Sequence, residues 1–227
     1  MVTMGLIGVV LYYAVFNYSL IYTSASQGAL VQSCIPAMTA LVAVVWLREH
    51  ASALRWTGIA LSMVGILIVF SGGAAESGSA SLLGNALMFV SAVLWGIYTS
   101  MAKRVAAFDP LQVTAGIIGA GAILLLPLAA FEIAAEGMPQ VDLRGWLGIA
   151  YLGAGASGLA YMLYSAALKH VDASEAGVYT NLIPIVGVIM GVMLGEPLSL
   201  RAIAGGVVVL AGVWLTSKQP AASQAKA

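Results

Sequence analysis

Long apolar runs dominate the hydrophobic pattern of the chain, and short segments rich in charged residues, Gly, Pro and Ser separate them. A helix needs about 20 mostly apolar residues to cross the ~30 Å hydrocarbon core of a bilayer. Eight runs of roughly this length contain no Lys, Arg, Asp or Glu, and they cover residues 4–22, 26–47, 56–70, 82–102, 111–131, 145–168, 176–194 and 202–216. The runs lack the alternation of a membrane barrel, whereas a helix satisfies its own backbone hydrogen bonds in lipid. The pattern therefore predicts an all-α fold, a polytopic transmembrane bundle of about eight helices.

Composition supports a membrane location and excludes several classes of function. Hydrophobic residues make up 61% of the chain and charged residues 8%, whereas a soluble domain carries about 25% charged residues. The net charge is zero and no basic patch is present, so nucleic-acid binding is not expected. Cys34 is the single cysteine, which excludes an internal disulfide and a multi-cysteine metal site. No cofactor is expected, and no removable signal peptide precedes the first apolar run.

The distribution of basic residues predicts the orientation in the membrane. If both termini are cytoplasmic, the inside loops and tail hold seven of the nine Lys and Arg residues, and only Arg144 and Arg201 lie outside. Basic residues concentrate in cytoplasmic loops of membrane proteins. We therefore expect both termini inside.

An internal repeat relates the first three predicted helices to the last three. Matching positions keep nearly one offset, with a one-residue slip; the pairs are Tyr13 and Tyr161, Leu20 and Leu168, Ala25-Ser26 and Ala173-Ser174, Ile35-Pro36 and Ile183-Pro184, Glu49 and Glu196, Gly58 and Gly205, Gly65 and Gly212. Equivalent helices are five spans apart, an odd number, so they cross the membrane in opposite directions. This is an inverted repeat, a design that gives transporters two openings of similar energy around a midplane site.

The repeat divides the chain into two units and a tail. Residues 1–73 are predicted to be the remainder of a first unit with three helices, and residues 82–217 a second unit with five. Residues 218–227 are predicted to be a disordered cytoplasmic tail. The fourth and fifth helices lack counterparts at the front, which leaves a shortened chain and a genuine eight-helix protein both open.

Together these motifs resemble the EamA-type permeases of the drug/metabolite transporter superfamily. The resemblance spans nearly the whole chain and is carried by Ala25-Ser26, Pro36, Arg48-Glu49, Trp56, Gly58 and Gly65, by Ala173-Ser174, Pro184, Gly195-Glu196-Pro197, Gly205 and Gly212, and by Trp95-Gly96. Such permeases have ten helices in two inverted repeats, so the resemblance implies that the first two are missing here. It also implies transport of small metabolites or drug-like compounds by alternating access, in a bacterial inner (plasma) membrane.

Polar and aromatic residues inside the spans are the candidates for the substrate pathway, because lipid disfavours unpaired hydrogen-bonding groups. They are Tyr12, Tyr13, Asn17, Gln32, Trp95, Tyr98, Tyr161, Tyr164, Tyr179 and Asn181. The alternatives are an interfacial aromatic belt and amides that hold helices together. Pro36 and Pro184 are candidates for a hinge or gate, with a static packing kink as the alternative.

Two further functions compete with a permease. An intramembrane enzyme needs a nucleophile and base, a metal cluster or a carboxylate pair within the membrane, and the spans offer none, so no enzyme is expected. A non-transporting assembly subunit or an inactive transporter fragment remains the alternative. Spans without fixed charges favour neutral, zwitterionic or amphipathic small-molecule substrates over polyanions. They leave the coupling ion, the direction of transport and a homodimer open.

Overall fold

The computed structural model describes residues 1–49, 51–76, 82–171, 173, 176, 182–195 and 199–217, and these residues form helices without strands. The segments, in order, are α1 (Val2–Gly5), η1 (Leu6–Leu11), α2 (Tyr12–Ser19), α3 (Ala25–Gln32), α4 (Ile35–Trp46), α5 (Ala53–Glu76), α6 (Leu82–Arg104), α7 (Pro110–Glu136), α8 (Leu143–Ala150), η2 (Tyr151–Leu159), α9 (Ala160–Ala167), α11 (Leu182–Met193) and α12 (Leu200–Ser217). The α1–η1–α2 and α8–η2–α9 segments are each continuous, and η1 and η2 are π-helical.

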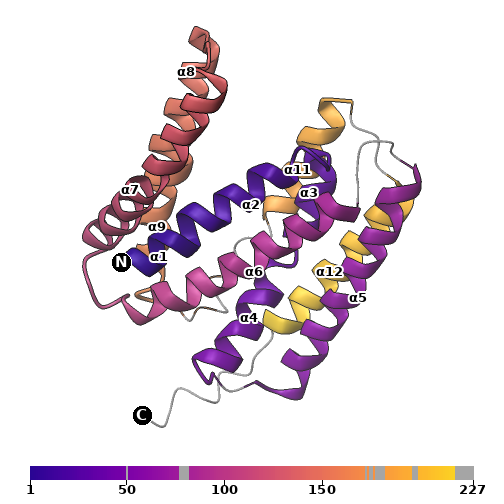
Figure 1. Cartoon of the computed structure of the whole chain (residues 1–227). Helices are drawn as coiled ribbons and strands as arrows, with labels where there is room; N and C mark the ends of the chain where they lie inside the picture. Colours follow the sequence, from indigo (N-terminus) through magenta and orange to yellow (C-terminus); the bar gives the residue numbers. More distant parts are fainter. Residues whose placement is uncertain are drawn as a thin grey trace.

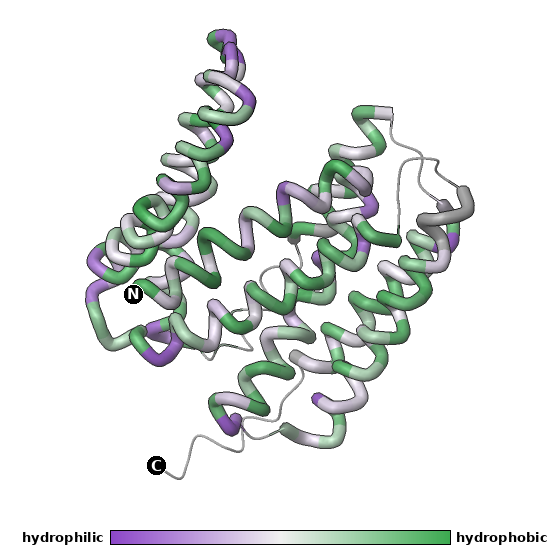
Figure 2. Tube along the Cα trace, in the orientation of Figure 1, coloured by the Kyte–Doolittle hydropathy of each residue, from purple (hydrophilic) through white to green (hydrophobic). Residues whose placement is uncertain are grey.

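Six of these helical stretches are long and apolar enough to cross a membrane, and Leu200–Thr216 forms a shorter apolar helix. Hydrophobic residues cover most of each helix, with hydrophilic ones gathered toward the helix ends (Figure 2). The prediction of an all-α membrane bundle is confirmed. Within the seventh predicted span, the helix α11 begins at Leu182.

The pairing of α5 with α12 displays the inverted repeat directly (Figure 1). A β-carbon placed on Gly58 would lie 2.5 Å from the carbonyl oxygen of Gly212, and one placed on Gly65 would lie 2.8 Å from that of Gly205. The helices are therefore antiparallel and nearly touch through their backbones. Because the sequence repeat pairs Gly58 with Gly205 and Gly65 with Gly212, exchanging the repeats converts one contact into the other. A pseudo-two-fold axis passes between α5 and α12.

The ends of the repeated helices also match in backbone conformation. Arg48 follows α4 with φ 57°, and the equivalent Gly195 follows α11 with φ 78°. A left-handed residue at this place ends a helix, and glycine adopts it without strain. The first repeat thus has an arginine where the second has the residue that suits the turn.

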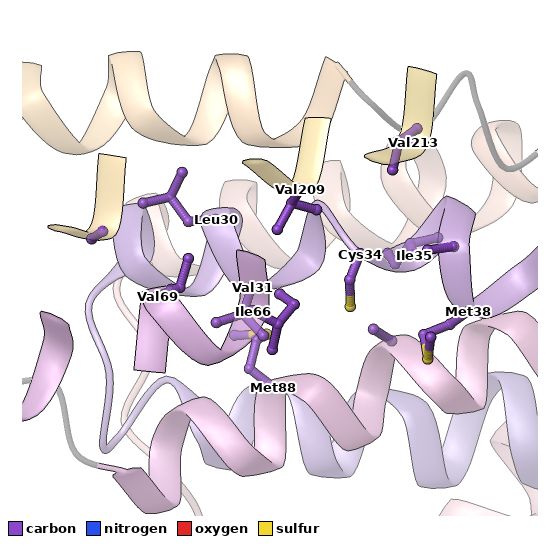
Figure 3. Close-up of a cluster of buried hydrophobic side chains, with 13 residues drawn as sticks. Leu30, Val31, Cys34, Ile35, Met38, Ile66, Val69, Met88, Val209 and Val213 are labelled. Carbon is purple, nitrogen blue, oxygen red and sulfur yellow. The ribbon is translucent and has the colours of Figure 1, made fainter. Parts of the chain in front are cut away.

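The main hydrophobic core fills the space between α3, α4, α5, α6 and α12. Figure 3 shows Val31 and Cys34 facing Val209 and Met88 across this core. A second cluster joins α1, η1, α6, α7 and α9, with Ile117 and Tyr161 at its centre. The two clusters meet at Trp95, which packs against both.

The helices α7 and α8 project from the rest of the bundle (Figure 1). In the α3–α4 span 78% of the residues are buried inside the bundle, whereas only 11% are buried in α7 and 6% in the α8–α9 span. Their outward side chains are apolar, as expected of surfaces that face lipid. The face of α1 and η1 that α7 covers has its repeat equivalent on η2, where most residues are exposed.

Basic side chains at the end of α6 hold three helix ends together. The Lys103 ammonium donates hydrogen bonds to the carbonyl oxygens of Leu168 (3.1 Å) and Val171 (2.6 Å), just after α9. Arg104 donates to the carbonyl oxygen of Trp46 (3.3 Å) and lies 4.5 Å from the centre of its ring. Cations at helix C-termini offset the partial negative charge of the last carbonyls. We call this end of the bundle, where α4, α6 and α9 terminate, the basic end.

The structure corrects one detail of the sequence interpretation and locates another residue more closely. Arg55 was placed in a loop, but it lies in the first turn of α5, is 2% exposed and forms an ion pair with Glu49 at 3.0 Å. Pro36, a predicted hinge or gate residue, lies within the Ala25–Trp46 span, which is interrupted at Ser33 and Cys34, and it occupies the first turn of α4. A proline is accommodated there because the first amides of a helix need no intrahelical acceptor.

Candidate functional site

Six aromatic residues from three helices converge on the interior of the bundle. We call them the aromatic cluster; its members are Tyr12, Tyr13, Trp95, Tyr98, Tyr161 and Tyr164. Trp95 lies at the centre, with its ring 5.0 to 5.5 Å from the rings of Tyr12, Tyr98, Tyr161 and Tyr164. The rings meet mostly edge-on or tilted, the arrangements that aromatic quadrupoles favour. All six belong to the predicted pathway residues, which the fold therefore brings together.

The cluster combines paired and unpaired polar groups. The Tyr164 hydroxyl lies 3.0 Å from the Thr99 hydroxyl. The indole N–H of Trp95 and the hydroxyl of Tyr98 are buried without a hydrogen-bond partner among the described residues. Because an unpaired buried donor costs about 1 to 3 kcal/mol, such groups mark places where a water molecule or a ligand would bind.

A pocket of about 500 Å³ lies beside the aromatic cluster, between α2, α3, α6 and α11. Its lining residues are Phe16, Leu20, Ala25, Gly28, Ala29, Gln32, Met88, Ile183, Val186 and Gly187. Gln32 is the polar side chain among them, and none is charged. The pocket can therefore receive an apolar group and offers one amide for orientation.

Gln32 is held in place by α6. Its amide nitrogen donates to the Ser91 hydroxyl at 2.7 Å and approaches the Met88 sulfur at 3.1 Å. The amide oxygen is buried without a partner among the described residues, and the side chain is 2% exposed. An acceptor in this state is available to a hydrogen-bond donor that enters the pocket.

The pocket and the aromatic cluster are adjacent. The ring of Phe16, which lines the pocket, stacks on that of Tyr12 with centroids 5.8 Å apart. Along α6, Met88 lies near the start, and Trp95 and Tyr98 lie between it and Lys103. The aromatic cluster therefore separates the pocket from the basic end.

The remaining predicted site residues do not all join this arrangement. Asn17 is exposed on α2 and lines neither the pocket nor the cluster. Tyr179 and Asn181 lie outside the described residues, and Pro184 is the third residue of α11 as described. Pro127 of α7 is an in-helix proline that sequence reasoning did not single out.

Sequence reasoning also missed the apolar lining. Phe16 and Met88 contribute no polar group, so nothing in the sequence distinguishes them from ordinary packing residues. The spacing of Phe16 four residues after Tyr12 places both on one face of α2 and is the one signal that could have linked it to the cluster. Within the described residues, no group of three or more His, Cys, Asp or Glu side chains could hold a metal ion.

The chain matches the EamA-like transporter family over residues 1–71 and 82–218. It belongs to this family. The EamA-family chain is 27% identical to the uncharacterized transporter YyaM of Bacillus subtilis (strain 168), over 95% of its own length and 72% of that protein's. It is 24% identical to a probable terminal-alkyne amino-acid exporter of Streptantibioticus cattleyicolor, over 95% of its length and 71% of that protein's.

A solved structure has the same fold. A crystal structure at 21% identity superposes with a TM-score of 0.68, over 95% of this chain and 75% of the other. The predictions of an EamA-type protein, of a membrane permease with a small-molecule substrate, and of a protein that is not an enzyme are confirmed by the family and its relatives. The EamA-family chain is an integral membrane protein surrounded by lipid.

Proposed function

We propose that this permease moves small neutral or zwitterionic molecules with a large apolar part, and that the pocket between α2, α3, α6 and α11 binds them. The observation that carries the proposal is the pocket itself, with about 500 Å³ of apolar lining around the partly unpaired amide of Gln32. Pockets of 300 to 1,000 Å³ suit small organic ligands. The amide oxygen of Gln32 accepts a hydrogen bond from the substrate and orients it.

The absence of charge among the described lining residues supports this substrate class. A phosphorylated or polyanionic substrate needs Lys or Arg to replace its hydration. One relative is named a probable terminal-alkyne amino-acid exporter, and an amino acid with an apolar side chain is a compound of the proposed class.

The pathway continues from the pocket through the aromatic cluster to the basic end. In alternating access the two inverted repeats exchange conformations, and the substrate leaves on the side opposite to its entry. The unpaired donors of Trp95 and Tyr98 give the substrate polar contacts as it passes. The interruption of the α3–α4 span before Pro36 supplies a hinge next to Gln32, and Pro184 holds the equivalent place in the second repeat.

The basic end faces the cytoplasm in this proposal, in a bacterial inner membrane. Arg55, Lys103 and Arg104 gather there, as expected of the cytoplasmic ends of membrane helices. The first unit then comprises residues 1–73 and the second unit residues 82–217.

Flux through liposomes tests the proposal. The purified chain is reconstituted with a pool of neutral, zwitterionic and anionic metabolites, and transport is followed by mass spectrometry. Gln32→Leu removes the acceptor, and loss of one buried hydrogen bond should raise the half-saturating concentration about fivefold to tenfold. Val186→Phe places a larger side chain in the pocket, which makes the pocket smaller, and it removes no hydrogen bond. It should therefore reduce flux of the larger substrates first.

Asn17→Leu is the matched control, because it makes the same amide-to-leucine change on an exposed face outside the pocket. Its flux should equal that of the unaltered chain. The binding-site proposal fails if Gln32→Leu and Val186→Phe both transport normally. Preferential transport of anionic phosphate esters would contradict the substrate class, and the absence of all flux would favour an assembly subunit instead.

A further inference from the structure

Two tyrosines at equivalent positions of the inverted repeats each reach into the π-helical segment of the other repeat. The Tyr161 hydroxyl of α9 donates a 2.6 Å hydrogen bond to the carbonyl oxygen of Gly8 in η1. The Tyr13 hydroxyl of α2 lies 3.1 Å from the Ser157 hydroxyl in η2. Since the sequence repeat pairs Tyr13 with Tyr161, the equivalent tyrosine of each repeat contacts the π-helical segment of the other, Tyr161 at a backbone carbonyl and Tyr13 at a side-chain hydroxyl.

The π-helical segments are also related by the repeat. At the offset that pairs the tyrosines, η1 (Leu6–Leu11) falls on the last six of the nine residues of η2 (Tyr151–Leu159). A π-helical stretch widens the helix by the equivalent of one inserted residue, disturbs the regular ladder of hydrogen bonds, and occurs often at functional sites. Both repeats therefore carry the same irregularity, and in each repeat it is contacted by a tyrosine from the other repeat.

Close packing at Gly8 gives Tyr161 its access to the backbone. A side chain at this position would collide with the ring of Tyr98, so the bare backbone of η1 lies directly against the aromatic cluster. The rings of Tyr13 and Tyr161 stack with centroids 6.5 Å apart and an angle of 26° between their planes. The two tyrosines that make the hydrogen bonds are therefore in contact with each other. One hydrogen bond thus joins α9 to η1, and the other joins α2 to η2.

We propose that Tyr13 and Tyr161 form a paired latch that closes the pathway between the pocket and the basic end. The proposal rests on transport by alternating access, in which α2 and α9 separate at the basic end when the pathway opens there. Separation breaks both hydrogen bonds, and the π-helical segments take up the change in backbone. The bond from Tyr161 is the shorter one and is buried, so it contributes more to the closed state than the bond from Tyr13.

Accessibility of a buried position tests the latch without any substrate. Thr99 is fully buried beside Tyr164, four residues from Trp95 and toward the basic end, so Thr99→Cys in a Cys34→Ala background reports opening on that side. A membrane-impermeant maleimide is applied to everted and to right-side-out vesicles. In the everted vesicles, where the basic end is outside, Tyr161→Phe should speed labelling about fivefold to tenfold, as expected from loss of one buried hydrogen bond.

Further variants separate the latch from a general loosening of the fold. Tyr13→Phe and Ser157→Ala should each speed labelling by a smaller factor than Tyr161→Phe, and this factor should be the same for both. Combining them should add nothing, because both substitutions remove the same hydrogen bond. Tyr151→Phe is the control, since it makes the same change at an exposed ring within η2. Its labelling rate should equal that of the background.

The outcomes are distinct from those of the flux experiment. Faster labelling of Tyr161→Phe and Ser157→Ala from the basic end alone supports the latch even when no transported compound has been found. Unchanged labelling in both variants overturns it, as does an increase seen equally in Tyr151→Phe. Faster labelling only from the opposite side also overturns it.

Discussion

The contact between α5 and α12 allows a test of the inverted repeat itself. Gly65→Ala would place a methyl group 2.6 Å from the backbone nitrogen of Val209 and 2.8 Å from the carbonyl oxygen of Gly205. The neighbours are backbone atoms and cannot rotate away. The two helices must therefore move apart to admit the methyl group.

The size of the effect follows from these distances. An ordinary contact begins at 3.4 Å, so the approach of 2.6 Å must lengthen by about 0.8 Å. When two packed helices move apart by about 0.5 to 1 Å, each atom pair along the contact loses about a quarter to a half of its dispersion energy. Overpacking of this kind typically costs about 1 to 3 kcal/mol. We expect Gly65→Ala to destabilise the protein by this amount.

The same close contact can be tested at four glycines, because each of the two contacts between α5 and α12 involves one glycine from each helix. Gly205→Ala would meet Val69 and Gly65 at 2.7 and 2.8 Å, and Gly58→Ala and Gly212→Ala would meet each other's helices at 2.5 to 2.6 Å. All four substitutions should cost similar amounts. The Gly65→Ala and Gly205→Ala double variant should cost less than the sum of the two, because helices already separated by one methyl group admit the second more easily.

Unfolding of the purified protein in mixed micelles, followed by circular dichroism against increasing SDS, measures these costs. Gly119→Ala of α7 is the control, because nothing lies within 4 Å of the position that its methyl group would take. It should leave stability unchanged or raise it slightly. A Gly65→Ala variant as stable as the Gly119→Ala control would refute the close packing of α5 on α12. Unequal costs at Gly58 and Gly205, or at Gly65 and Gly212, would refute the symmetry.

Two further predictions concern the ends of α4 and α5. Arg48→Gly should stabilise the protein by about 0.5 to 1 kcal/mol in the same unfolding assay, because Arg48 has φ 57° where the second repeat has Gly195. Arg48→Ala should give no gain in stability. An equal gain from both substitutions would contradict the backbone argument. Glu49→Gln should cost about 3 kcal/mol, because it removes the carboxylate that forms a 3.0 Å ion pair with the buried guanidinium of Arg55. The double variant Glu49→Gln with Arg55→Met should recover most of that loss, and a double variant as unstable as Glu49→Gln would show that the buried charge is not the cause.

Much of the fold and part of the site could be read from the sequence. The apolar runs predicted the spans, since about 20 apolar residues in water are more costly than the same residues in lipid. The six rings of the aromatic cluster were among the predicted pathway residues because each carries a hydrogen-bonding group that lipid disfavours. Repeated Gly, Pro and Glu positions predicted the inverted repeat, and the pairing of α5 with α12 confirmed it.

Other features were hidden because the sequence does not set the rotation of a helix that is apolar on every side. Asn17 and Phe16 are neighbours on α2, yet the first faces outward and the second lines the pocket. The π-helical segments were equally unpredictable, because they depend on what packs against η1 and η2 rather than on a local propensity.

The sequence by itself determined which segments leave water and that two sets of them repeat in opposite directions, because hydrophobicity and identity at matched positions are local properties of the chain. Only the tertiary structure decided that Tyr161 reaches Gly8, that Tyr13 reaches Ser157, and that Gln32 keeps a free acceptor beside the pocket. These partners lie far apart along the chain, and their meeting depends on how whole helices pack.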